Sequence, residues 1–184
     1  GSMLTMLTVG RLVGRKGHHK VLEAMSKLVA AGMNQIQYVI VGSGMEYHSL
    51  LKHAQKLNIE PLVKFYQNVG DEDLPRMYRQ ADVFVMPTEV KGRDMEGFGI
   101  VYLEAGLSGL PVIASKLPGV DEAVVHGETG VLAEAGNPDQ IAAAIKFLAD
   151  NPEMRKQYGQ AGRQRVLDEF MCEHQAKKLT PYMS

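Results

Sequence analysis

The chain has 184 residues and a formal net charge of −1 at pH 7. This length is enough for one domain with a sizeable core, and the near-neutral charge excludes a global basic field for nucleic acid. No apolar run approaches the roughly 18 residues that a membrane-spanning helix needs. Cys172 is the only cysteine, which excludes an internal disulfide and a cysteine-based metal site. Residues 1 and 2, Gly-Ser, are typical of a cloning scar.

Strand-like and helix-like segments alternate along the chain. Short apolar runs are predicted to be strands at residues 4–9, 36–41, 63–66, 83–86, 110–114 and 130–132. Because helices separate these strands, the sequence predicts βαβ units and a mostly parallel sheet. The strands are continuous apolar runs, which is typical of a sheet covered by helices on both faces. We therefore predict an α/β fold with a doubly wound, Rossmann-like parallel sheet of about six strands.

Helices are predicted between and after these strands, at residues 21–28, 50–57, 71–81, around residue 104, and in two segments before residue 170. Asp71 is expected to cap the third of them. Asn137 and Asn151 each precede a proline and an acid, a pattern that predicts the starts of the last two. We expect one domain at residues 3–170, followed by a helical tail at residues 171–184.

A glycine-rich turn with several cations follows the first predicted strand, from Gly10 and Arg11 to Lys16 and Gly17. At a helix N-terminus, such a turn is a suitable cradle for a pyrophosphate. It has neither the G-K-[ST] of a Walker loop nor the G-x-G-x-x-G of a dinucleotide site. A surface turn with solvated cations explains this segment equally well. The Gly42-Ser43-Gly44 loop after the second strand is a weaker signal, because two glycines often simply allow a tight turn.

Two glutamates flank a glycine-containing turn and an apolar segment in EGFGIVYLE, residues 96–104. The apolar residues that follow the turn cover almost every face of a helix, which predicts a buried helix. Glu104 in such a helix requires a donor: a protein cation, a backbone amide or a ligand hydroxyl. The glycines leave backbone amides open at the start of the helix, where an anion is favoured. The segment therefore predicts a ligand that carries both phosphate and hydroxyl groups.

Together, the order and spacing of these motifs resemble the C-terminal half of retaining GT-B glycosyltransferases. This large group 1 family uses nucleotide-diphosphate sugars and carries paired glutamates in an E-x(7)-E spacing. The resemblance extends over nearly the whole chain, about residues 4–170. The motifs that carry it are Gly10-Arg11 with Lys16-Gly17, Gly42 with Gly44, the strand ending Met86-Pro87-Thr88, Glu96 through Glu104, and Gly109-Leu110-Pro111-Val112.

The resemblance implies a role for each matching residue. Glu96 is implied to be the catalytic glutamate that contacts the donor sugar near the reacting carbon. Glu104 is implied to accept hydrogen bonds from the ribose hydroxyls. Arg11 and Lys16, on the loop that begins at Gly10, are implied to hold the diphosphate. The backbone amides that contact the sugar and the phosphate are implied to be those of Gly97, Phe98, Gly99 and Ile100.

The resemblance also implies the ligand and the partners. The donor substrate is expected to be a UDP- or GDP-sugar, with no cofactor and no metal, because fixed cations and helix amides can stabilise the charge on the leaving group. The active site of a GT-B enzyme lies between two halves, so an N-terminal acceptor domain is the expected partner. We expect the isolated domain to be inactive alone. Its expected location is the cytoplasm, either free or peripherally associated with the inner face of the membrane.

Two other classes of protein remain open. A non-catalytic nucleotide-binding module of α/β fold would show the same cradle. A dinucleotide-dependent oxidoreductase domain would share the fold, but it requires G-x-G-x-x-G after the first strand and an acid about 20 residues further on. The sequence has Gly-Arg-Leu-Val-Gly at that place, which disfavours the oxidoreductase.

Overall fold

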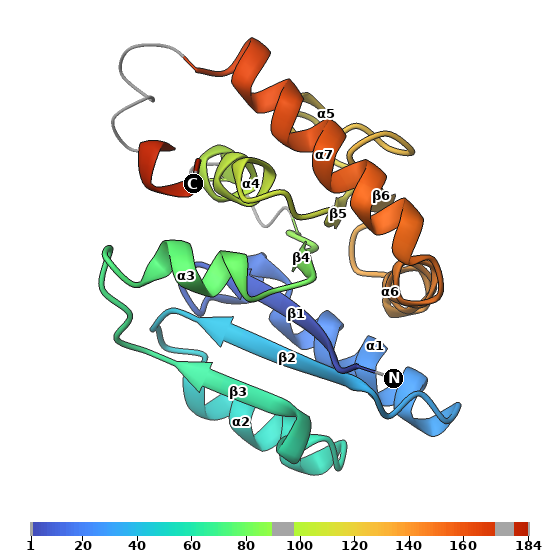
Figure 1. Ribbon diagram of the computed structural model, residues 1–184. Helices are drawn as coiled ribbons and strands as arrows, with labels where there is room; N and C mark the ends of the chain where they lie inside the picture. Colours follow the sequence, from blue (N-terminus) through green and yellow to red (C-terminus); the bar gives the residue numbers. More distant parts are fainter. Residues whose placement is uncertain (1, 90–97, 172–178, 184) are drawn as a thin grey trace.

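The computed structural model of the chain describes residues 2–89, 98–171 and 179–183 (Figure 1). Its centre is one six-stranded sheet with the strand order β3-β2-β1-β4-β5-β6, and every strand pair is parallel. The predicted doubly wound α/β fold is therefore confirmed. The strands are β1 (Leu4–Val9), β2 (Ile36–Val41), β3 (Val63–Tyr66), β4 (Val83–Met86), β5 (Val112–Ser115) and β6 (Gly130–Ala133).

Helices cover both faces of the sheet, and each face has its own apolar core layer. The first layer joins the sheet to α1 (His18–Ala30), α2 (Tyr47–Lys56) and α6 (Pro138–Asp150). The second joins it to α3 (Leu74–Arg79), α4 (Phe98–Leu107), α5 (Val120–Ala123) and α7 (Pro152–Glu169). Because side chains alternate along a strand, β1 contributes Leu4 and Met6 to the first layer and Leu7 and Val9 to the second.

The predicted helix starts have different outcomes. Asn137 caps α6 as predicted, since its side chain accepts from the Gln140 amide. Asn151 directly precedes α7, but its side chain does not cap the helix. Its side-chain amide donates to the Phe147 carbonyl at 2.8 Å. The predicted cap at Asp71 is wrong, because α3 begins only at Leu74. A helix starting at Asp71 would place Pro75 where its missing N–H breaks an i to i−4 hydrogen bond.

The C-terminal tail returns to the second core layer. Thr180–Tyr182 form a single 3-10 turn, η3, and residues 172–178 of the predicted helical tail lie outside the described residues. Leu179 and Tyr182 are buried against this layer. Arg163 on α7 donates to the Leu107 carbonyl at 2.9 Å and to the Met183 carbonyl at 3.0 Å. One guanidinium therefore attaches the tail to the end of α4.

The outer edge of β6 has side-chain partners for its outward amides. The Leu132 amide donates to Nδ1 of His126 at 3.0 Å, and the Glu134 amide donates to the side chain of Gln140 at 2.7 Å. These contacts satisfy two amides that an edge strand otherwise leaves open. Within the described ranges, no helix combines the length and the apolar character needed to cross a membrane.

Candidate functional site

The loops that follow β1 and β2 lie directly against each other at the carboxyl edge of the sheet. The Gly10 amide donates to the Val41 carbonyl at 3.0 Å, and the Leu12 amide donates to the Ser43 carbonyl at 2.9 Å. Gly42 has φ +139°, and a Cβ there would lie 2.0 Å from the Gly10 carbonyl oxygen. The glycines of the second loop therefore do more than permit a tight turn, because they let the first loop approach.

The two predicted diphosphate cations lie on the first loop, in different environments. Arg11 is exposed, whereas Lys16 ends a short 3-10 turn, η1 (Gly14–Lys16), and is buried. The Lys16 stem passes over Gly10, since its Cε lies 3.8 Å from the position of a Cβ at that glycine. The sulfur of Met86 lies 3.9 Å from the same position. Lys16 is thus held where β1 and β4 end.

The loop after β1 also packs on the loop after β4. The Glu89 amide donates to the Arg15 carbonyl at 2.7 Å. Gly17 has φ +82°, and a Cβ there would lie 2.2 Å from the Pro87 carbonyl oxygen. Because β1 and β4 are neighbours whose connections leave in opposite directions, this contact lies at the topological switch point of the sheet. Ligands of doubly wound sheets bind at that point.

His18 is the first residue of α1, directly after Gly17, and it is only 2% exposed. Burial, followed by the charges of His19 and Lys16, lowers its pKa to about 3. Its imidazole is therefore neutral at pH 7, and its Nε2 has no hydrogen-bond partner among the described residues. No pattern in the sequence marked His18 as a buried residue of the site.

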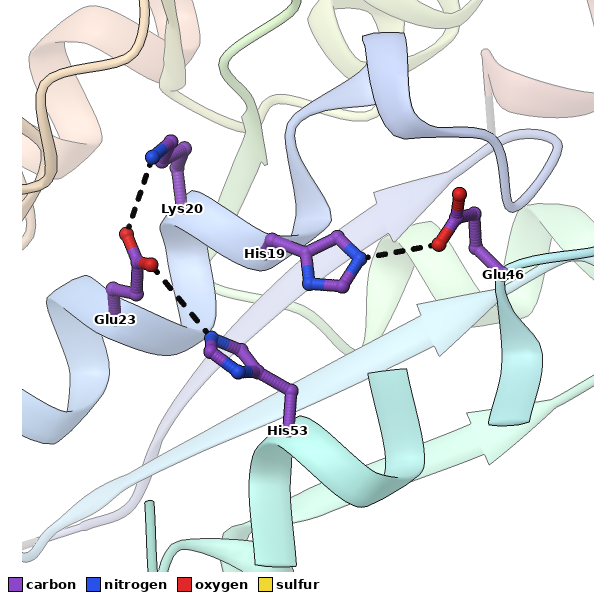
Figure 2. A network of polar contacts seen from close by, with 5 residues as sticks. All are labelled: His19, Lys20, Glu23, Glu46 and His53. Carbon is purple, nitrogen blue, oxygen red and sulfur yellow. Dashed lines mark hydrogen bonds and ion pairs between the residues drawn. The ribbon is translucent and has the colours of Figure 1, made fainter. Parts of the chain in front are cut away.

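A set of polar contacts joins the start of α1 to α2 (Figure 2). Nε2 of His19 lies 3.3 Å from the carboxylate of Glu46, the residue that precedes α2. Glu23 lies between Lys20, its ion-pair partner at 3.5 Å, and the imidazole of His53 at 3.8 Å, whose pKa burial lowers below its ordinary value. Half-buried pairs of this kind contribute at most about 1 kcal/mol each. Their main effect is to fix the direction of α1 behind the loop that carries Lys16.

The second part of the site is α4, the helix that carries Glu104. It is a buried helix, as predicted. The side chain of Tyr102 attaches α4 to the sheet. Its hydroxyl donates to the Met86 carbonyl at 2.7 Å and lies 3.5 Å from the Thr88 hydroxyl. Lys16 and α4 therefore both border the carboxyl end of β4. The described part of the chain brings the two halves of the predicted site to one edge of the sheet.

Glu104 is 9% exposed, and its described partners are tyrosine hydroxyls. The Tyr78 hydroxyl donates to its Oε1 at 3.2 Å. The Tyr182 hydroxyl acts on the same carboxyl group and lowers its pKa. Burial raises the pKa of Glu104, the hydrogen bonds from Tyr182 and Tyr78 oppose that rise, and the nearby Asp71 adds to it. The sequence anticipated a cation, an amide or a ligand hydroxyl, and did not identify these two donors.

Only part of the predicted set can be placed. Glu96 and Gly97 lie outside the described residues. Phe98 and Gly99 begin α4, and Ile100 is half-buried in its first turn. The assigned roles of these residues, and those of Gly10, Arg11, Lys16 and Glu104, stay predictions.

A family model described as "Glycosyl transferases group 1" matches residues 3–165. The chain belongs to the group 1 glycosyltransferases. The resemblance stated from the motifs is therefore confirmed.

Curated relatives of this group 1 glycosyltransferase chain are longer proteins. A GDP-mannose-dependent alpha-(1-6)-phosphatidylinositol monomannoside mannosyltransferase of Mycolicibacterium smegmatis is 33% identical over 186 residues, which span 100% of the chain and 48% of that protein. The glycogen synthase of Mycobacterium tuberculosis is 30% identical over 165 residues, which span 90% of the chain and 38% of that protein. The chain thus spans about half the length, or less, of these relatives.

Solved glycosyltransferase structures share the fold. The sucrose-phosphate synthase of Thermosynechococcus elongatus superposes with a TM-score of 0.83 at 30% identity, covering 97% of this chain and 44% of its own. HepE of Anabaena, solved with UDP, gives 0.83 at 23% identity and covers 98% and 47%. The C-terminal domain of LpcC from Francisella tularensis gives 0.81 at 23% identity and covers 94% and 88%. The fold is that of the C-terminal, Rossmann-like half of a GT-B glycosyltransferase.

Proposed function

We propose that the chain is the donor domain of a retaining glycosyltransferase, which binds the nucleoside diphosphate part of a UDP- or GDP-sugar. The observation that carries this proposal is the meeting of Lys16 and the Glu104 helix at the carboxyl end of β4. A cation there can bind a diphosphate, and a buried carboxylate can accept from ribose hydroxyls. The acceptor would come from an N-terminal domain, in keeping with relatives about twice as long.

The proposed chemistry uses groups of the chain itself and no cofactor. As the bond from the sugar to the diphosphate breaks, negative charge grows on the leaving group. Arg11, Lys16 and the first amides of α4 would stabilise that charge, because fixed donors require no reorganisation when the charge develops. Glu96 would contact the sugar at the reacting carbon. A GDP-sugar as the donor is supported by the name of the GDP-mannose-dependent relative.

Replacing either cation by alanine is expected to weaken the binding of a nucleoside diphosphate about tenfold or more, because each charge-assisted hydrogen bond contributes about 1.5–3 kcal/mol. Calorimetric titration of Arg11→Ala and Lys16→Ala with UDP, GDP and ADP measures the effect. Lys20→Ala is the matched control, since Lys20 is a nearby lysine of α1 that pairs with Glu23 within the same helix. Unchanged dissociation constants in both variants, or loss of binding in EDTA, would contradict the proposed site.

The two glutamates are expected to act at different stages. Glu104→Gln should weaken the binding of the bare nucleoside diphosphate by about 1–2 kcal/mol, because it removes charge-assisted bonds to the ribose. Glu96→Gln should leave that binding nearly unchanged and lower the turnover of the complete enzyme far more, because its contacts are strongest at the reacting sugar. Equal losses of diphosphate affinity in the two variants would show that this division is wrong.

The effect of Glu104→Gln on stability separates a functional role from a structural one. Burial raises the pKa of Glu104 in the folded chain above its value in the unfolded chain. The favourable contribution of this group to the free energy of folding is therefore complete only below the unfolded pKa, and it is lost as the pH rises through the folded pKa. At pH 7 the buried charge therefore disfavours the apo fold, and the substitution should not lower the Tm. A clear fall in Tm without a specific loss of affinity would assign Glu104 to structure alone.

The remaining candidate is a non-catalytic nucleotide-binding module. It would bind the same diphosphate and respond to the same cation substitutions. A transfer assay on the complete protein, with the donor that binds most tightly, distinguishes the two. Glycosyl transfer supports the enzyme, and binding without any transfer supports the module.

A further inference from the structure

The C-terminal tail places a tyrosine hydroxyl at the carboxyl group of Glu104. Tyr182 lies in the turn η3, and its ring contacts that of Tyr78 edge to face, with centroids 5.3 Å apart and planes at 90°. The Tyr78 hydroxyl donates to Glu104 at 3.2 Å, and the Tyr182 hydroxyl acts on the same carboxyl group and lowers its pKa. Tyr78 comes from α3 and Glu104 from α4, so three separate parts of the chain meet at one carboxylate. This tail segment matches none of the motifs that identified the site.

The tail is fastened at this place by contacts that do not involve Glu104. Leu179 is fully buried in the second core layer, and the Met183 carbonyl accepts from Arg163. The same arginine donates to the Leu107 carbonyl, which is one turn beyond Glu104 on α4. The position of Tyr182 is therefore fixed relative to the helix that carries the carboxylate.

We propose that Tyr182, with Tyr78, is a positioning residue of the nucleotide site, and that it holds the Glu104 carboxylate in the orientation that accepts the two ribose hydroxyls. The inference rests on the proposed function. A carboxylate offers about four lone-pair sites. If the two tyrosines occupy one side, the remaining sites match the pair of hydroxyls that a ribose presents. The tail would then form one wall of the ribose pocket.

Both tyrosines are fixed as donors. Burial is the largest cause that raises the pKa of Tyr78 and of Tyr182, and the neighbouring Glu104 raises both further. Neither hydroxyl ionises at neutral pH, so neither repels the carboxylate. The other charged group described near the carboxylate is Asp71, in the turn before α3, whose negative charge opposes ionisation of Glu104. The two hydroxyls therefore help to keep Glu104 ionised in a buried place.

The test compares Tyr182→Phe with the unchanged 184-residue chain. The nucleotide among UDP, GDP and ADP that binds most tightly is titrated calorimetrically, together with its 2′,3′-dideoxy form. Tyr182→Phe keeps the ring that packs on Tyr78 and removes only the hydroxyl. It should weaken binding of the ribonucleotide about fivefold, the scale of one hydrogen bond, and change binding of the dideoxy form less than twofold. Tyr158→Phe, a buried tyrosine of the other core layer, should change neither.

A pH series adds a result that loss of packing alone would not produce. Protonation of Glu104 removes its capacity to accept from the ribose, so affinity should fall on the acid side. Without the Tyr182 hydroxyl the pKa of Glu104 rises further, so the midpoint of this fall should move to higher pH in Tyr182→Phe. Tyr78→Phe should move it in the same direction.

Several results would overturn the inference. If the chain binds nucleotides but Tyr182→Phe weakens the ribose and dideoxy forms equally, the tyrosine is structural. If Tyr182→Phe binds the ribonucleotide more tightly, the hydroxyl competes with the ribose instead of positioning its acceptor. If no nucleoside diphosphate binds the unchanged chain, the proposed function fails, and this inference fails with it.

Discussion

Gly17→Ala is expected to destabilise the domain by more than about 3 kcal/mol, which is the range of severe steric substitutions. The added Cβ would lie 2.2 Å from the Pro87 carbonyl oxygen and 2.8 Å from its carbon. Both atoms belong to backbone, so no side-chain rotation can relieve the contact. The φ of +82° adds strain, about 1–2 kcal/mol for a residue with a Cβ. For a domain of this size the Tm should fall by roughly 10 °C.

Gly32→Ala separates the two causes. Gly32 also has a left-handed φ, +96°, but nothing lies within 4 Å of its Cβ position. This variant should therefore lose only the conformational part, about 1–2 kcal/mol. Urea denaturation of both variants measures the difference. Equal losses would mean that the contact between Gly17 and Pro87 has no energetic weight.

Gly17→Ala also bears on the proposed function. The alanine can be accommodated only if the start of α1 moves away from the loop after β4. That movement carries Lys16, the residue directly before Gly17, away from the end of β4. In the fraction of Gly17→Ala that stays folded, nucleotide affinity should fall as well, whereas Gly32→Ala should bind like the unchanged chain.

His18 is expected to make the domain sensitive to acid. Its folded pKa is about 3, below the ordinary value of 6.5, so the unfolded chain binds a proton that the folded chain rejects. Its full contribution to stability is present above pH 6.5 and is lost as the pH falls toward the folded value. At about 1.4 kcal/mol per unit of pKa difference, the loss reaches roughly 3 kcal/mol by pH 4.5.

His18→Gln should remove most of this loss. Urea denaturation at pH 7.0 and pH 4.5 gives the change in unfolding free energy for each protein, and the change should be about 3 kcal/mol smaller in the variant. His48→Gln is the control, because His48 is exposed on α2. A variant whose acid sensitivity matches that of the unchanged chain would show that His18 is not the group responsible.

The sheet was predictable because its strands carry their own signals. The first four strands begin and end where the apolar runs predicted, since burial against helices on both faces keeps most of their residues apolar. The strand predicted at residues 110–114 was found at Val112–Ser115. The short helix α5 was missed, because four residues are too few for a periodic pattern.

The place of the candidate site, at the carboxyl edge of the sheet, was predictable from its glycines and cations, whereas its buried polar contacts were not. The motif spacing indicated Lys16 and Glu104 because both lie on loops or helices that meet at one edge of a parallel sheet. The partners of Glu104 could not be read in the same way. Tyr78 resembles an ordinary core residue of α3, and Tyr182 lies 78 positions beyond Glu104 in the chain. Only the folded chain shows that their hydroxyls meet.

The side-chain contacts on β6 bear on how the domain behaves in concentrated solution. Unpaired amides at a sheet edge are a template for strand addition by another molecule, and hence for aggregation. On β6 an incoming strand would first have to displace His126 and Gln140 from the amides they accept from. At the opposite edge, β3 is only four residues long and carries the exposed Lys64, and both features disfavour pairing. We therefore expect the domain to resist aggregation through its sheet edges at the high protein concentrations that titrations with weak ligands require.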